Sequence, residues 1–181
     1  MKKKKNVLLF VDVLAVVLLI ALDQVTKYLA VLKLKGQEAF SIIPKVLELK
    51  YLENRGAAFG MLQNQKAFFI CMEVLILIIV CYILAKCPAQ KKYRLGRICM
   101  VCIAAGDVGN MIDRVMQDYV VDFIYFVPIN FPIFNVADIY VTLSTIGLVL
   151  LLMFVYKEED LSFLSFQQKK FRDVDGSNGK S

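Results

Sequence analysis

Two acids with different surroundings are the residues of this chain best suited to chemistry. Asp122 stands in the run VVDFI, where apolar neighbours favour the neutral carboxylic acid. Asp138 lies three residues after Asn135, a good helix N-cap, so the positive end of that helix would favour its carboxylate. Carboxyl groups whose pKa values are pushed apart can divide the roles of acid and base. The chemical interpretation is a proton-sharing pair; the alternative is a capping acid beside an unrelated loop acid.

A second polar group occupies the segment AAGDVGNMIDRV. Asp107, Asn110 and Asp113 follow one another at intervals of three residues. Arg114 comes four residues after Asn110, so a helix would carry all four on one broad face. Packing alone does not require this many hydrogen-bonding groups in a membrane helix, so the segment indicates a functional surface. On local sequence Asp113 also rivals Asp122 as the reactive acid.

Asp23 and Lys27 are one helical turn apart, close enough to form an ion pair. Such a pair either ends a helix at the membrane interface or forms one wall of a polar site, and the residues alone leave both interpretations open. Asp12 and Glu73 stand alone in apolar runs and are expected to have structural roles. For Asp12 this would be protonation or a bond to a neighbouring helix.

The composition indicates a membrane protein and excludes several kinds of catalytic and metal site. Its 181 residues are 59% apolar and 21% charged, more apolar than a soluble domain of this length requires. The absence of histidine excludes Ser/His and Cys/His nucleophile pairs and the commonest zinc sites. Cys99 and Cys102 form a CxxC without a second pair, and all five cysteines lie in apolar runs or in a basic gap. Neither a metal site nor a disulfide is therefore expected.

Four apolar stretches approach the roughly 20 residues that a bilayer-spanning helix needs. They are residues 6–28, 67–85, 98–113 and 136–156. Basic residues at 2–5 and between 86 and 97 predict that both chain ends are cytoplasmic, and they explain the net charge of +6 without nucleic acid as a partner. The first stretch lacks a small-x-small cleavage site and is expected to be a retained helix.

The connection between the first two stretches would face outward and carries a strand pattern. Leu47, Leu49 and Tyr51 alternate with other side chains, which favours a strand. The next segment, NRGAAFG, contains Gly56 and Gly60, which permit close backbone approach. We expect a mainly α membrane protein of four transmembrane helices with a small extracytoplasmic β-sheet over about residues 33–62. Residues 1–156 would form one domain, and the polar tail 157–181 is expected to be disordered.

The motifs together resemble those of lipoprotein signal peptidase, also called signal peptidase II, a family of bacterial aspartic peptidases of the cytoplasmic membrane. The resemblance covers about residues 7–156. It includes five motifs in order: DQVTK (23–27), NRGAAFG (54–60), GNMIDR (109–114), VVDF (120–123) and FNVAD (134–138). The four apolar stretches also lie at matching places.

The resemblance implies that Asp122 and Asp138 form the catalytic dyad, in which one carboxylate takes a proton from water and the other polarises the scissile carbonyl. The implied substrate is a prolipoprotein that carries a diacylglyceryl group on its cysteine and is cleaved just before that residue. The active site would lie near the extracytoplasmic face, in contact with membrane lipids. No metal, organic cofactor or obligate protein partner is implied.

Further residues match motif positions that bind substrate or orient the dyad. These supporting positions are Asn54, Gly56, Asn110, Arg114 and Asn135, with Asp23, Lys27 and Asp113 expected to maintain the structure of the site. Asp107 departs from the pattern, because a small or apolar residue is expected there.

Three other classes of protein compete with this hypothesis. A proton-coupled carrier would also place acids in membrane helices, but it normally shows paired repeats and a site near the midplane. A metal-dependent lipid phosphotransferase could hold Mg²⁺ with the outer acids Asp107, Asp113, Asp122 and Asp138, although its nucleotide donor would favour the cytoplasmic side. A non-enzymatic scaffold would leave these acids without a purpose.

Overall fold

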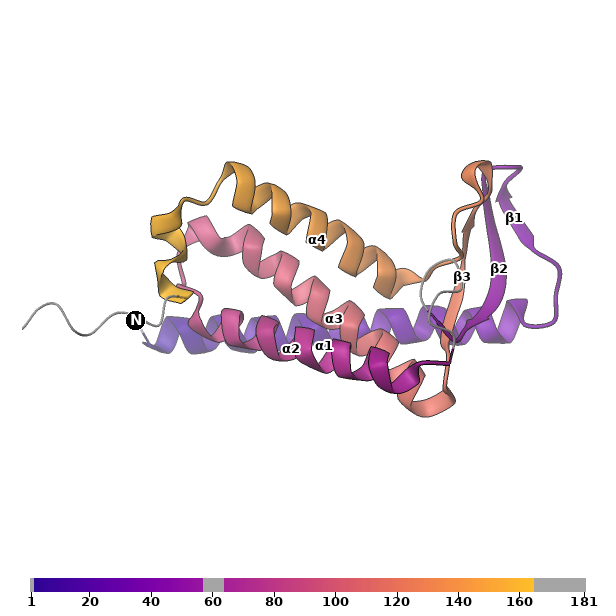
Figure 1. Ribbon diagram of the computed structural model, residues 1–181, viewed down its shortest axis with the longest axis horizontal. Coiled ribbons are helices and arrows are strands. Elements are labelled where there is room, and N and C mark those ends of the chain that lie inside the picture. The colour runs from indigo at the N-terminus through magenta and orange to yellow at the C-terminus, as the bar shows by residue number, and fades with distance from the viewer. Residues whose placement is uncertain (1, 57–63, 165–181) are drawn as a thin grey trace, which may run out of the picture.

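The computed structural model describes residues 2–56 and 64–164, which form a helix bundle with a small sheet at one end (Figure 1). The α-helices are α1 (Lys2–Leu34), α2 (Lys66–Lys86), α3 (Arg94–Gln117) and α4 (Val136–Phe154). Each of these four described helices contains a segment long and apolar enough to cross a membrane. The expected four-helix membrane fold is therefore confirmed.

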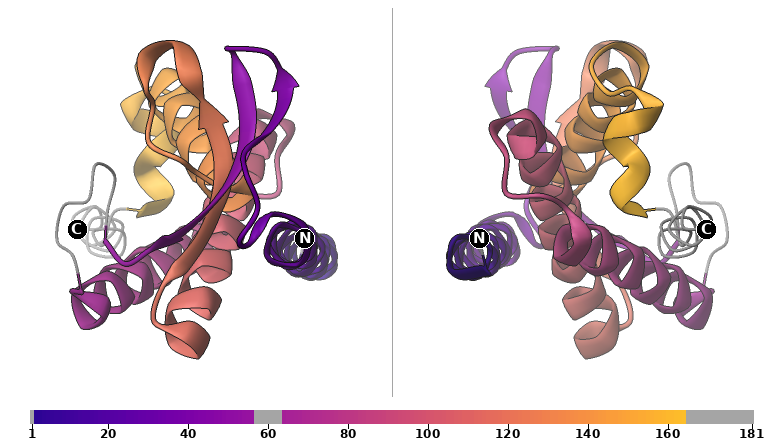
Figure 2. Two further views of the ribbon diagram at one scale, coloured as in Figure 1. Left: turned by 90° about the vertical axis from the view of Figure 1, so that its right-hand side faces the viewer. Right: turned by 90° about the vertical axis from the view of Figure 1, so that its left-hand side faces the viewer.

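Helix α3 is the central element of the bundle. In its most apolar window 56% of residues are buried within the protein, against 11–17% in the other three helices. Figure 2 looks along the bundle and shows α3 between α1, α2 and α4, all of which it contacts. Gly106 permits this packing, because a Cβ there would lie 2.5 Å from the backbone oxygen of Ala137 on α4. Small residues of this kind let membrane helices approach closely.

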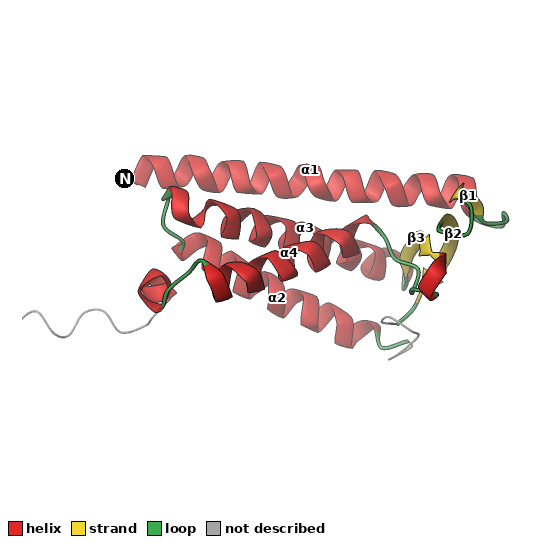
Figure 3. Ribbon diagram, turned by 90° about the horizontal axis from the view of Figure 1, so that it is seen from above, coloured by secondary structure: helices red, strands yellow, loops and turns green. Residues whose placement is uncertain are grey.

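Large apolar side chains on the other helices point away from the protein. Phe10 and Leu18 of α1 and Met153 of α4 are each more than half exposed. Contiguous apolar surface of this extent is a surface for lipid, not for water. Figure 3 shows the long α1 lying along one side of the bundle, and this helix exposes apolar residues over most of its length.

The expected sheet is present and has three antiparallel strands in the order β1-β2-β3. Strands β1 (Phe40–Ile43) and β2 (Leu47–Asn54) come from the predicted region, whereas β3 (Val120–Phe126) comes from the α3–α4 connection, for which the sequence analysis predicted no strand. In the β2–β3 register Leu52 pairs with Asp122 and Asn54 pairs with Val120.

Helix α1 extends six residues beyond the predicted end at 28. Ala30 and Leu34 of the added turns form a buried cluster with Val121 and Phe123 of β3. Burial of this apolar contact stabilises both segments. The extra length of α1 and the unpredicted strand therefore have the same cause, which is their mutual packing.

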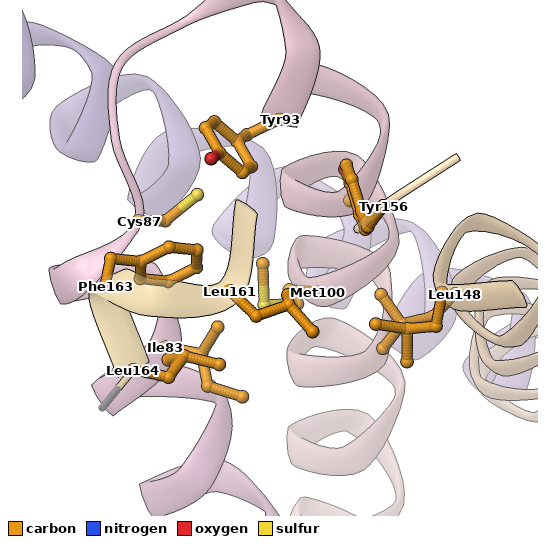
Figure 4. Close-up of a pocket in the computed structure, with 11 residues that line it drawn as sticks. Ile83, Cys87, Tyr93, Met100, Leu148, Tyr156, Leu161, Phe163 and Leu164 are labelled. Carbon is orange, nitrogen blue, oxygen red and sulfur yellow. The ribbon is translucent and has the colours of Figure 1, made fainter. Parts of the chain in front are cut away.

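The first part of the polar tail, for which disorder was expected, contains the 3₁₀-helix η4 (Glu158–Leu164). Its ordering comes from tertiary contacts: the Tyr93 hydroxyl donates a 2.9 Å hydrogen bond to the Asp160 backbone oxygen, and Phe163 packs edge-on against the Tyr93 ring. Figure 4 shows Leu161, Phe163 and Leu164 lining an apolar cavity. The cavity has a volume of about 150 Å³ and lies at the end of the bundle opposite the sheet (Figure 1). Residues 165–181, and positions 57–60 of NRGAAFG, lie outside the described residues.

Candidate active site

Asn135 connects the two acids that the sequence singled out. Its side-chain Nδ2 donates to Asp122 Oδ1 at 2.7 Å, and its backbone N–H donates to Asp138 Oδ2 at 3.0 Å. Its Oδ1 accepts a 3.0 Å bond from the Asp138 backbone N–H, which completes a capping box at the start of α4. The predicted N-cap is therefore confirmed, and it also holds a carboxyl group of β3.

Asp122 is almost completely buried, with 1% of its surface exposed. Its second oxygen, Oδ2, accepts a 2.8 Å hydrogen bond from Asn54 Nδ2 of β2. Asn54 is itself held by the backbone N–H of Gly56, which donates to its Oδ1 at 3.0 Å. Burial, and then the nearby charge of Asp138, raise the pKa of Asp122 to about 7. This carboxyl group can therefore hold or release a proton near neutral pH.

Asn110 of α3 supports the other acid. Its Nδ2 donates to Asp138 Oδ1 at 2.9 Å, so both oxygens of Asp138 accept hydrogen bonds. The Oδ1 of Asn110 accepts from Asn135 Nδ2 at 3.2 Å and from Lys27 Nζ at 2.9 Å. These donors also determine the orientation of the Asn110 amide. The polar face predicted for α3 thus reaches the pair through Asn110.

Lys27 lies between two acids in the interior. Its Nζ is 2.9 Å from Asp23 Oδ2 and 3.1 Å from Asp113 Oδ2, and all three side chains are at most 4% exposed. Asp23 and Lys27 therefore form a wall of the polar site, which was one of the two interpretations left open. Asp113 differs from Asp122 in its contacts. Asp113 accepts a 3.0 Å hydrogen bond from the backbone N–H of Val121, so it anchors β3 beside Asp122.

Gln24 is a residue of this site that the sequence analysis did not select. Its Nε2 donates to Asp113 Oδ1 at 3.1 Å and to the Gly109 backbone oxygen at 3.1 Å, so it joins α1 to α3. Gly109 allows the approach, because a Cβ there would lie 2.6 Å from Asp23 Oδ2. The only indication of this role in the sequence was the position of Gln24 next to Asp23. Adjacent side chains on a helix need not share a face, so that position did not predict the contacts of Gln24.

Arg114 lies apart from the two acids. Its Nη1 donates to Glu73 Oε1 on α2, and its guanidinium lies 4.7 Å from the centre of the Phe69 ring. Within the described residues it forms no hydrogen bond to Asp122 or Asp138. Of the predicted site residues it is the one that the structure does not bring to the pair.

The remaining membrane acids have separate surroundings. Asp12 is paired with Arg97 of α3 near the other end of the bundle, in agreement with a bond to a neighbouring helix. Asp107 is 7% exposed, and its Oδ2 has no hydrogen-bond partner within the described part of the chain. In that same part no three acidic or cysteine side chains gather as a metal site would require. The four acids of the Mg²⁺ alternative are therefore not arranged as one cluster.

The sequence and the fold are similar to those of known proteins. Residues 15–155 match the family model described as signal peptidase (SPase) II. The lipoprotein signal peptidases of Streptococcus pyogenes serotype M1 and serotype M5 (strain Manfredo) are each 40% identical over 148 residues, covering 82% of this chain and 94% of the relative. A bacterial membrane enzyme solved by the in meso method at 1.9 Å resolution superposes with a TM-score of 0.70 at 35% identity, covering 81% of this chain and 94% of that one. A second such structure, at 2.3 Å, gives 0.69 at 30% identity, with coverages of 88% and 94%.

Proposed function

The chain belongs to the signal peptidase II family of aspartic peptidases, and we propose that it removes signal peptides from diacylglyceryl-modified prolipoproteins by cleaving before the lipid-modified cysteine. The observation that carries the proposal is the bridge through Asn135, which bonds Asp122 with its side chain and Asp138 with its backbone. Two carboxyl groups held by one residue are suited to share a proton across a reacting group.

In the proposed mechanism Asp122 carries the proton and Asp138 is the carboxylate. The raised pKa of Asp122 supports the first assignment, and the position of Asp138 in the first turn of α4, near the positive end of the helix dipole, supports the second. Asp138 takes a proton from water as the water oxygen attacks the scissile carbonyl carbon, and Asp122 gives its proton to the carbonyl oxygen. Asp138 then gives its proton to the leaving nitrogen, and the new hydroxyl returns a proton to Asp122 as the C–N bond breaks.

The other polar residues have supporting roles in this proposal. Asn54 and Asn110 orient the two carboxyl groups, and Gly56 holds Asn54. The Asp23, Lys27 and Asp113 network keeps α1, α3 and β3 in register. Arg114 binds the peptide of the substrate from the side of α3 that faces α2.

We place the protein in the cytoplasmic membrane with both termini cytoplasmic and the sheet outside. Exposed basic residues at Lys91, Lys92 and Arg94 lie at the end of the bundle opposite the sheet, which favours a cytoplasmic location for that end. A site at the outer surface lets the acyl chains of the substrate stay in the bilayer while the peptide bond reaches the dyad. Burial of about 0.8 kcal/mol per CH₂ makes the lipid a strong positioning group. Nucleic acid, cofactors and an obligate protein partner have no part in the proposal.

The test is cleavage of a lipid-modified prolipoprotein by the purified protein in detergent, with a chelator present. Wild-type protein should cleave before the modified cysteine, as mass spectrometry of both products would show. Asp122→Asn and Asp138→Asn should each lose about 10³-fold or more in turnover. Asp118→Asn is the matched control. Asp118 lies on the same α3–α4 connection as Asp122, but it is exposed and forms an ion pair with Lys66 of α2. Normal turnover of Asp122→Asn would refute the dyad, and a requirement for Mg²⁺ would refute the mechanism.

A further inference from the structure

Glu73 is a buried acid on α2 that the proposed mechanism does not use. It is 8% exposed and lies in a membrane-spanning helix, where an ionisable side chain is costly and asks for a partner. Its Oε1 accepts a hydrogen bond from Arg114 Nη1, and the two side chains are 10% and 13% exposed. The partner of Glu73 is therefore a residue of the polar α3 face and not a surface group.

Glu73 and Phe69 hold Arg114 together. They are four residues apart on α2 and so lie on one face, with the Arg114 guanidinium 4.7 Å from the centre of the Phe69 ring. The Glu73 carboxylate fixes the direction of one guanidinium nitrogen of Arg114. The Phe69 ring covers one side of the guanidinium group. A guanidinium has five N–H donors in a rigid fork, so donors remain for other acceptors.

Arg114 is close along α3 to two residues that contact the proposed dyad or the strand beside it. Arg114 is one helical turn beyond Asn110, which donates to Asp138, and it directly follows Asp113, which anchors β3 beside Asp122. Residues one turn apart share a helix face. A peptide that extends from the dyad along α3 would meet this guanidinium, whose donors match the carbonyl oxygens of a peptide backbone.

A second acid on the same face provides a comparison. Asp107 lies two turns before Arg114 and is as deeply buried as Glu73, yet it has no hydrogen bond to Arg114, and its Oδ2 is without a partner among the described residues. The two acids are thus similarly buried, and among the described residues only Glu73 forms a hydrogen bond with the arginine.

We infer that Glu73 is a positioning residue for the substrate peptide: through its bond to Arg114 it holds the guanidinium against α2, one helical turn beyond Asn110. The inference rests on the proposed peptidase function and names a residue of that same site. Glu73 acts on substrate binding through Arg114 and does not touch the reacting atoms.

The test is a double-mutant cycle on cleavage of the lipid-modified prolipoprotein, with KM and kcat measured separately. Glu73→Gln keeps the shape of the side chain and removes its charge, and it should raise KM about tenfold because a misplaced binding group weakens binding steeply. Arg114→Met alone should raise KM at least as much. In the Arg114→Met background, Glu73→Gln should change KM by less than about twofold, since the residue through which it acts is gone. Asp12→Asn is the matched control, because Asp12 forms the same kind of buried pair with Arg97 near the other end of the bundle, and it should leave KM within about twofold of wild type.

Thermal unfolding of each variant separates this role from a purely structural one. A Glu73→Gln protein that melts at a lower temperature but keeps the wild-type KM would overturn the inference. A tenfold effect that persists in the Arg114→Met background would also overturn it, because Glu73 would then act independently of Arg114. If wild-type protein does not cleave the substrate at all, the proposed function fails, and the inference fails with it.

Discussion

The backbone N–H of Ala137 donates a 2.9 Å hydrogen bond to Asp23 Oδ1, which joins residues 114 positions apart. The first N–H groups of a helix have no partner within the helix, so this acid of α1 satisfies one of them at the start of α4. The other oxygen of Asp23 is 2.9 Å from Lys27 Nζ. Because Asp138 is the next residue after Ala137, Asp23 determines where the first turn of α4 lies relative to α1.

Replacing Asp23 should therefore lower stability and activity together. Asp23→Ala leaves the Ala137 N–H without its acceptor and removes one of the two acids around Lys27, and removal of one partner of a buried ion pair costs about 3–5 kcal/mol. Thermal unfolding in detergent and cleavage of the lipid-modified substrate would measure the two effects. Lys35→Ala is the control, because Lys35 pairs with Glu53 on the surface and its loss should change neither. Equal melting temperatures for the two variants would contradict the prediction.

The close contact of α3 with α4 predicts that Gly106 cannot be enlarged. A Cβ at Gly106 would lie 2.5 Å from the Ala137 backbone oxygen and 2.8 Å from Val141 Cγ2, so α4 would have to move. Gly106→Ala should destabilise the protein by about 1–3 kcal/mol and reduce turnover, since Asp138 moves with the helix. At Gly147 a Cβ would contact only Cys99 Sγ among the described residues, at 3.3 Å, so Gly147→Ala should have a smaller effect. Comparison of the two variants in one unfolding series would decide, and a larger effect at Gly147 would refute the explanation.

Asn135 has two roles that one substitution can separate. Serine is as good an N-cap as asparagine, but it lacks the Nδ2 donor that asparagine extends to Asp122 and Asn110. Asn135→Ser should therefore keep most of the helix stability, while turnover falls about 10²-fold because the carboxyl group of Asp122, the proposed acid, loses its orientation. Asn135→Ala should lose the cap as well, at about a further 1 kcal/mol. Unfolding and cleavage assays on both variants test this; full activity of Asn135→Ser would show that the amide does not orient Asp122.

The raised pKa of Asp122 predicts that stability and activity both fall as pH rises. Burial first, and then the charge of Asp138, raise this pKa from 3.8 to about 7. Between about pH 4 and pH 7 the folded protein keeps a proton on Asp122 that the unfolded chain has lost, so the free energy of unfolding decreases as pH rises through this window. Because protonated Asp122 is the proposed acid, kcat/KM should also fall above about pH 7.

The two parts of this pH prediction have separate measurements. Unfolding of wild type and Asp122→Asn across the window should show a weaker pH dependence in the variant, since the group that takes up the proton is absent. A pH–rate profile of wild type should show the alkaline limb. A kcat/KM that stays constant to about pH 9 would contradict the assignment of Asp122 as the acid.

The sequence by itself determined the features that depend on local patterns. Hydropathy predicted the four membrane helices, because a bilayer selects for apolar length irrespective of what packs beside it. The spacing of Asn135 and Asp138 predicted the N-cap, since a capping box closes within one turn. The order of the motifs identified the family and selected Asp122 and Asp138 as the pair.

Only the tertiary structure decided which polar groups meet. Asn54 donates a hydrogen bond to Asp122, which lies 68 residues later in the sequence, and Glu73 accepts one from Arg114, 41 residues later. No pattern in the neighbouring sequence predicts either contact. Strand β3 formed because β2 and the end of α1 are there to pair with it and bury it. A hydrogen bond or buried contact stabilises a residue only when its partner is in place, and the fold places partners that are distant in sequence.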